Sequence, residues 1–208
     1  MGWFTCAALL ALGLRPGISE TGVEEQVSIR KVVGNKAILA RGEQDFYLVQ
    51  TSTACSSLAH QEGRTVLVRS PGGLLGAQSG LLLVGERQPC RITRAAALFS
   101  DAAPSVDDAA RTDELAIDHP PALLALQEAL MLLGHDPGTV GNKAETMKVV
   151  SEFRRQYGNE PTLEGLKKTV VLMALQVMSR NPNNGRAKGV SRKLLNMALG
   201  PDSSKIQP

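Results

Sequence analysis

The stretch LQEALMLLGHDPGTVGNKAETMKVVSEFRRQYG, residues 126–158, decides the fold of the C-terminal part of the chain. Its apolar residues recur at three- and four-residue steps, which is typical of one buried face on a helix. The pattern breaks at Gly134 and resumes after an Asp-Pro-Gly turn, so we expect two helices joined by a short connection. The second predicted helix ends at Gly158.

A third helix is predicted after Pro161. Thr162 can cap it, Glu164 lies in its first turn, and apolar residues continue an inward stripe as far as Val177. Successive helices with short connections favour a compact bundle. We therefore expect a three-helix bundle within residues 120–200, followed by a tail at 201–208.

Residues 24–95 have a different texture, with short apolar segments punctuated by glycine. Gly34 and Asn35 separate the first two segments by a two-residue loop, which predicts a hairpin. Six strands are predicted: VSIRKVV (27–33), KAILA (36–40), DFYLVQ (45–50), TVLVRS (65–70), GLLLVG (80–85) and CRITR (90–94). The fold class is therefore α+β, with a small antiparallel β domain that forms a sheet, a sandwich or a partly open barrel.

An acidic, alanine- and proline-rich segment at residues 96–119 separates these two regions. It carries a single basic residue, Arg111, against six acids: Asp101, Asp107, Asp108, Asp113, Glu114 and Asp118. Such a composition has little apolar area to bury, so we interpret the segment as a linker.

The N-terminal 19 residues resemble a secretory signal. The apolar run from Ala7 to Leu14 is too short to span a bilayer, and Gly17 and Ser19 are small residues of the kind found at cleavage sites. These features predict a periplasmic or secreted protein with no transmembrane segment after cleavage. No basic residue precedes the apolar run, so an apolar N-terminus of a cytosolic protein stays open as the alternative.

If Cys6 is removed with the signal, Cys55 and Cys90 are the two remaining cysteines. An even pair in an exported chain predicts a disulfide. The alternative is two buried free thiols. His60 lies five residues after Cys55, yet the flanking residues match no hydrolase signature, so a thiol nucleophile is disfavoured.

The C-terminal helices resemble the peptidoglycan-binding-like domain family. The matching residues are Leu126-Gln127, Leu133-Gly134, Pro137-Gly138, Thr146, Val150, Phe153 and Gly158, and the likeness covers about 60 residues. The resemblance implies a three-helix bundle that binds peptidoglycan or a related anionic wall polymer. In the family the segment after the turn is about two residues longer, a tyrosine stands at the position of His135 and a glutamine at that of Arg154.

These differences and the resemblance together locate the candidate ligand site beside the turn and the second helix. The candidate ligand-binding residues are Arg154, His135, Lys143, Asn142 and Arg155. Arg154 is the foremost of them, because a guanidinium can hold a carboxylate through two hydrogen bonds. The other interpretation is that the matching positions serve only the packing of a bundle without wall affinity, and that His135 is simply solvated.

Catalytic, metal and cofactor sites are not predicted. The three histidines lack the spacing of a metal site. The glycine-rich stretch SPGGLLGAQSGLLLVG (70–85) lacks the lysine ending of a phosphate loop and is read as a turn between strands. We therefore expect a protein that is not an enzyme, with an accessory module of a wall-modifying enzyme as the alternative.

Charge is unevenly distributed along the chain. Residues 143–205 hold twelve Lys or Arg and five Asp or Glu, although the whole chain carries a net charge of only +3. This basic end could meet an anionic envelope polymer. Nucleic acid is disfavoured, because aromatic residues make up only 3% of the chain. The expected function is non-catalytic wall binding in the cell envelope; the alternative is an interaction or scaffold protein that docks another envelope protein.

Overall fold

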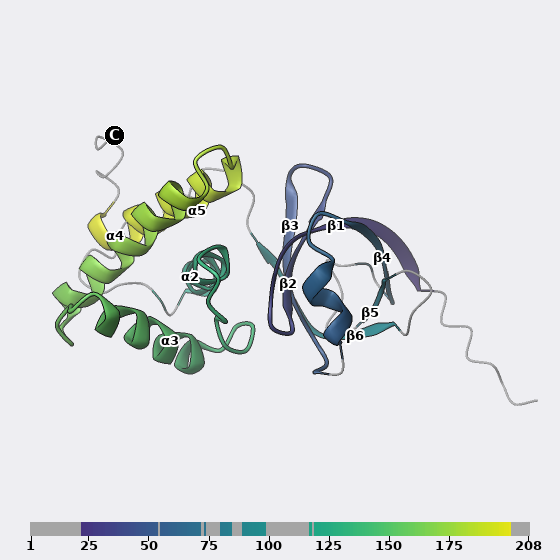
Figure 1. The fold of residues 1–208 in the computed structure, drawn as a ribbon, viewed down its shortest axis with the longest axis horizontal. Helices are drawn as coiled ribbons and strands as arrows, with labels where there is room; N and C mark the ends of the chain where they lie inside the picture. Colours follow the sequence, from purple (N-terminus) through teal and green to yellow (C-terminus); the bar gives the residue numbers. More distant parts are fainter. Residues whose placement is uncertain are drawn as a thin grey trace, which may run out of the picture.

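The computed structural model describes residues 22–53, 55–71, 73, 80–84, 89–98, 117 and 119–200. Figure 1 shows a β half and a helical half side by side, with α2 among the helices that lie toward the strands. The predicted signal at residues 1–19, most of the predicted linker and the tail at 201–208 lie outside the described residues.

Six antiparallel strands form a closed barrel in the order β1-β2-β3-β6-β5-β4. Their bounds are β1 Val23–Val33, β2 Lys36–Arg41, β3 Asp45–Thr51, β4 Thr65–Ser70, β5 Gly80–Leu83 and β6 Cys90–Leu98. The predicted hairpin is confirmed, since Val33 pairs with Lys36 across a loop in which Gly34 has a φ of 59°. Pairing of β1 with β4 closes the barrel.

Side chains alternate between the two faces of the barrel wall. The inward set forms the barrel core, to which the short 3₁₀ helix η1 (Ser56–His60) adds the buried Leu58. Outward residues of β2, β3 and β6 form a second apolar face. Strand β6 continues to Leu98, three residues past the predicted end of the β domain, because its last residues pair with β3 and pack on this outer face.

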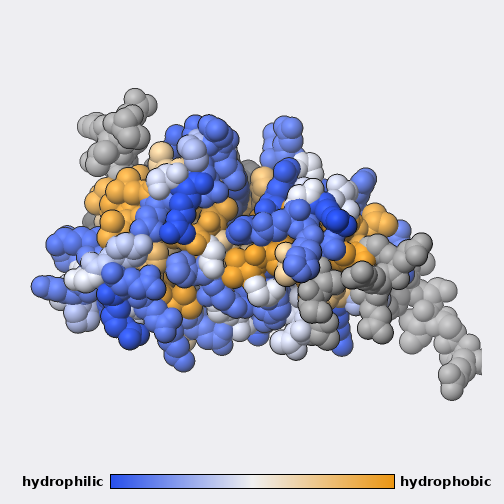
Figure 2. Space-filling view, in the orientation of Figure 1, coloured by the Kyte–Doolittle hydropathy of each residue, from blue (hydrophilic) through white to orange (hydrophobic). Residues whose placement is uncertain are grey.

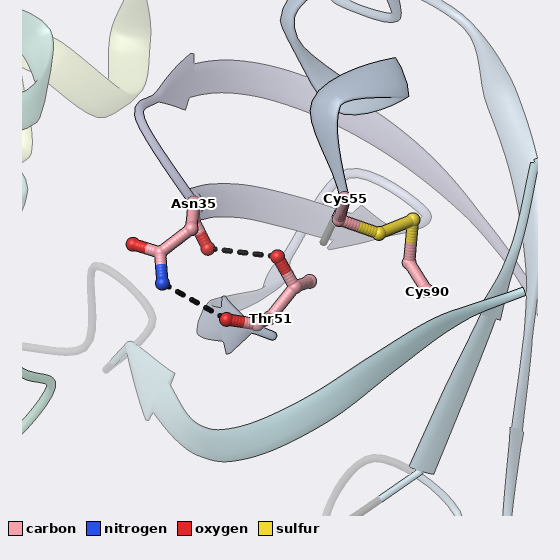
Figure 3. The surroundings of a disulfide bond; sticks show 4 residues. All are labelled: Asn35, Thr51, Cys55 and Cys90. Atoms are coloured by element: carbon pink, nitrogen blue, oxygen red, sulfur yellow. Dashed lines mark hydrogen bonds between the residues drawn. A yellow bond between two sulfur atoms is a disulfide. The ribbon is translucent and has the colours of Figure 1, made fainter. Parts of the chain in front are cut away.

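Cys55, next to η1, and Cys90, the first residue of β6, form the predicted disulfide (Figure 3). Their Cα atoms are 5.5 Å apart, a usual separation for a bridged pair. Beside it Asn35 and Thr51 join the ends of neighbouring strands, because the Asn35 amide donates to the Thr51 carbonyl at 2.9 Å and the Thr51 hydroxyl donates to the Asn35 carbonyl at 3.0 Å.

Reduction of this disulfide should destabilise the protein. The two cysteines are 35 residues apart, and loss of such a cross-link is worth roughly 3 to 4 kcal/mol in the chain-entropy treatment. Urea unfolding with and without reductant measures the difference, and thiol labelling of unfolded, unreduced protein should find neither Cys55 nor Cys90 free. Two labelled thiols in protein isolated without reductant would contradict the assignment.

The helical half contains four helices, so the expected three-helix bundle is wrong in number. They are α2 Pro120–Leu132, α3 Lys143–Gln156, α4 Leu163–Arg180 and α5 Gly185–Leu199. Helix α5 lies within the basic C-terminal end, for which the sequence predicted no fourth helix. It forms because Asn184 caps it and because Ala187, Val190 and Leu194 fall on one buried face against α2 and α4.

The two halves pack directly on each other through an apolar cluster. Its members are Ile38, Leu48 and Leu98 from the barrel and Leu124, Met131 and Val140 from the helical half. Ile117, from the end of the predicted linker, is buried in the main helical core. Side-chain packing therefore connects the barrel to the helices in addition to the chain itself.

Candidate functional site

The side chain of Gln127 is 0% exposed and forms hydrogen bonds with the turn at residues 134–142. The Gln127 amide nitrogen donates to the Thr139 carbonyl at 3.0 Å and to the Thr146 hydroxyl at 2.8 Å. The amide oxygen accepts from the Gly141 N–H at 3.1 Å. A buried amide whose donors and acceptor are used in this way shapes the turn and offers nothing to a ligand.

The other face of this turn docks on the barrel. Val140 is buried in the apolar cluster between the two halves, its N–H donates to Gln50 at 3.2 Å, and its carbonyl accepts from Arg94 at 3.3 Å. Asp136 forms an ion pair with Lys36 at 2.7 Å. The segment expected to face a ligand is therefore largely engaged with β2, β3 and β6.

Asn142, one of the predicted ligand residues, caps α3. Its side-chain oxygen accepts from the Glu145 N–H at 3.2 Å, and its amide nitrogen donates to the Glu145 carboxylate at 3.1 Å. That carboxylate also accepts from the Thr139 N–H at 2.6 Å. Hydrogen bonding from Thr139 holds the pKa of Glu145 below its ordinary value. The Asn142 side chain is thus committed to the start of the helix.

The remaining predicted ligand residues are spread along α3. Lys143 begins the helix and Arg154 lies eleven residues later, which is a rise of about 16 Å. The half-buried His135 makes a T-shaped ring contact with Phe153, with centroids 5.7 Å apart. Within the described part of the chain, the guanidinium groups of Arg154 and Arg155 have no hydrogen-bonded or ion-paired partner. The structure therefore does not gather the five predicted residues around one groove.

A cleft of about 780 Å³ opens where the helices meet the barrel. Its lining comes from both halves: Arg30, Lys31, Ile38, Glu43 and Phe46 from the barrel, and Glu128, Leu132 and residues 181–186 from the helical half. Junctions between domains are common places for ligand sites, and 300 to 1,000 Å³ is the usual range of pocket volumes.

Arg186 builds the inner wall of this cleft. Its guanidinium pairs with Glu128 at 2.7 Å, and the side chains are only 9% and 2% exposed. Two nitrogens of the guanidinium donate to the two oxygens of the carboxylate, so the pair is bidentate. The same guanidinium lies over the Phe46 ring, 4.7 Å from its centroid. This pair is a fixed structural feature of the wall.

The hydrogen-bonding groups available in the cleft lie nearer its mouth. Arg30 is exposed, and its guanidinium has no partner among the residues that the structure describes. Lys31 forms an ion pair with Glu62 at 3.3 Å. Asn183 and Asn184, in the loop before α5, are exposed, and Asn184 uses its side-chain oxygen to cap the helix while its amide nitrogen can donate. Glu43 is an exposed lining residue as well and adds one carboxylate to these donors.

The disulfide bears on the thiol nucleophile that was considered from the sequence. Cys55 is bonded to Cys90, so the pairing of a Cys55 thiolate with His60 is excluded. Over the described ranges no three His, Cys, Asp or Glu side chains come close enough to hold a metal ion. Nor does any described helix combine the length and apolar character needed to cross a bilayer.

No protein-family model, curated protein or solved structure matches this chain. The cleft residues were not among those singled out in the sequence, because they come from segments far apart in the chain: β1, β2, β3, α2, the loop before α5 and the start of α5. The one local signal was the run NPNNG at residues 181–185, which gathers polar amides next to a helix start.

Proposed function

We propose that this protein is a non-catalytic cell-envelope protein that binds the peptide part of peptidoglycan, or a related anionic wall polymer, in the cleft between barrel and helices. The observation that carries the proposal is the cleft itself, which is ligand-sized and lined by hydrogen-bond donors from both halves, with Glu43 as an exposed carboxylate among them. The family resemblance of the helices supports the choice of polymer. Export to the periplasm or the exterior belongs to the same proposal and is compatible with the disulfide.

The proposed recognition follows from the groups at the cleft mouth. Wall peptides present both carboxylates and backbone amides. The Arg30 guanidinium can hold one carboxylate through two hydrogen bonds, and the Asn183 and Asn184 amides can donate to neighbouring carbonyls. Phe46 and Leu132 line the cleft and offer apolar surface to small side chains of the ligand. Such a site gives modest affinity that falls with added salt.

The test is titration of soluble wall peptides into the full-length protein by calorimetry. Arg30→Ala should weaken binding roughly fivefold, since a partly exposed charged contact is worth about 1 kcal/mol. Arg192→Ala removes the same charge from an exposed position on α5 that does not line the cleft, and should leave the dissociation constant unchanged within twofold. The Arg30 effect should shrink when salt is raised from 50 to 500 mM.

Arg154→Ala separates this site from the one predicted beside α3. A loss of affinity in Arg154→Ala with none in Arg30→Ala would move the ligand to the α3 site. No binding by the wild type, either to soluble wall peptides or to insoluble wall material, would reject the proposed function.

A second candidate is the interaction protein whose helical half has lost wall affinity. The specific observation in its favour is that the 134–142 turn is engaged with the barrel through Val140, Asp136 and their partners. Failure of the full-length protein to sediment with insoluble wall would favour this candidate.

A further inference from the structure

Helices α4 and α5 form a second concave surface, away from the interdomain cleft. A groove of about 630 Å³ lies between the first half of α4 and the end of α5. Its apolar lining comes from Val171, Leu172, Ala198 and Leu199, and its polar lining comes from Asn159, Glu164, Lys167 and Lys168. We call these eight residues the α4–α5 groove.

Apolar side chains continue from this groove over the surface of the same helices. Leu163, Leu175 and Leu199 are 46%, 52% and 48% exposed, and they make up half of the strongly exposed large apolar side chains in the described ranges. Leu172 and Leu175 are three residues apart, so they share one face of α4. Figure 2 shows hydrophobic side chains gathered over the end of the molecule that holds α4 and α5, bordered by hydrophilic ones.

The charge on these two helices is mostly positive. Residues 163–199 contain seven Lys or Arg and a single acid, Glu164. Arg186 is paired with Glu128, and Arg180 donates to the Leu133 carbonyl. Among the described residues, the ammonium groups of Lys167 and Lys168 have no acidic partner within ion-pair distance. The groove therefore combines an apolar lining with two ammonium groups against the single Glu164 carboxylate, which leaves it with an excess of positive charge.

We propose that the α4–α5 groove docks an acidic, amphipathic segment of a partner protein. Apolar side chains of the segment would cover the leucines, and its carboxylates would meet Lys167 and Lys168. A concave groove between two antiparallel helices suits a discrete helical or extended segment, as in other helix-in-groove complexes. A sugar polymer would leave the leucines uncovered. The groove shares no residue with the interdomain cleft, so this surface would let a protein bound to the wall hold a second protein.

The test uses full-length protein and two fluorescein-labelled synthetic peptides of 18 residues in fluorescence anisotropy. One peptide is a helix former with leucines on one face and glutamates on both flanks; the other has lysine at every glutamate position. We expect the acidic peptide to bind with a micromolar dissociation constant, at least tenfold more tightly than the basic peptide. Raising the salt from 50 to 500 mM should weaken it, because exposed charge pairs are screened.

A matched pair of double variants locates the site. Lys167→Glu with Lys168→Glu should weaken the acidic peptide at least tenfold. Arg154→Glu with Arg155→Glu makes the same change of charge on two adjacent residues of α3, outside the groove, and should alter affinity less than twofold. All four side chains lie at or near the surface, so unfolding by urea should show both variants folded.

Several outcomes would overturn the proposal. The proposal fails if the acidic peptide does not bind, or if the two peptides bind equally well. It also fails if the α3 variant loses as much affinity for the acidic peptide as the groove variant does. If the acidic peptide does not bind, and the Lys167→Glu, Lys168→Glu variant loses binding to phosphatidylglycerol vesicles, the surface would be assigned to a lipid bilayer instead. Wall binding is measured separately. Arg30→Ala should leave binding of the acidic peptide unchanged, so a failure of the proposed wall binding can be distinguished from a failure of this docking proposal.

Discussion

Replacement of Arg186 by alanine is expected to lower the free energy of unfolding by about 3 to 5 kcal/mol, measured by urea unfolding. The reason is that Glu128, the ion-pair partner of Arg186, stays buried in the variant. Glu128 lies on α2 with a side chain that is only 2% exposed, and Arg186 holds both of its carboxylate oxygens. Removing one member of a buried ion pair leaves an uncompensated charge in a medium of low polarity, which costs several kcal/mol. The contact of Arg186 with the Phe46 ring is lost as well.

Two controls show whether the unpaired charge causes the loss. Arg192→Ala removes an exposed arginine from the same helix and should change the free energy of unfolding by less than about 0.5 kcal/mol. The double variant Glu128→Met with Arg186→Met removes both charges and should recover most of the stability, as apolar replacements of buried pairs often do. A double variant as unstable as Arg186→Ala would mean that packing, and not the orphaned carboxylate, dominates.

Phe153→Ala should be comparably damaging, with a loss of about 3 to 5 kcal/mol. Phe153 is 2% exposed within the main helical core, where α2, α3, α4 and α5 meet. Its ring also contacts His135 edge-on and lies 4.8 Å from the Tyr157 ring, so truncation leaves a cavity lined by several elements. The measurement is urea unfolding, in which the midpoint should fall while the m-value stays the same as that of the wild type.

Tyr157→Ala provides the comparison for Phe153→Ala. Tyr157 is an aromatic residue directly after the same helix, but it is 42% exposed, and we expect a loss of about 1 kcal/mol or less. A loss below about 1 kcal/mol for Phe153→Ala itself would contradict the placement of its ring in the core.

If the two halves unfold as one unit, both substitutions should shift the whole transition. The apolar cluster formed by Leu48, Met131, Val140 and their neighbours joins the barrel to the helices, and Val140 adds two hydrogen bonds across the junction. A Phe153→Ala variant that shows two separate transitions would indicate that this junction does not couple the halves.

Local rules explain how much of the fold could be predicted. All six strands were predicted from short apolar segments punctuated by glycine, and the first three helices from an apolar period of about 3.6 residues. The hairpin at Gly34 followed from the need for a positive φ, and the pairing of Cys55 with Cys90 followed from counting cysteines under the assumption of export. Helix α5 was missed although Ala187, Val190 and Leu194 carry the right spacing, because basic residues fill its exposed face.

The sequence by itself determined the elements, since hydrophobic period, caps and turn glycines act over a few neighbouring residues. Only the tertiary structure decided how those elements meet. Closure of the barrel depends on β1 pairing with β4, some forty residues apart, and the cleft depends on β1 and β3 approaching the loop before α5. The 134–142 turn looked free to bind a ligand because nothing in its own residues encodes the barrel that covers it. Contacts between distant segments are set by which apolar faces bury each other, and that choice is made only when the whole chain packs.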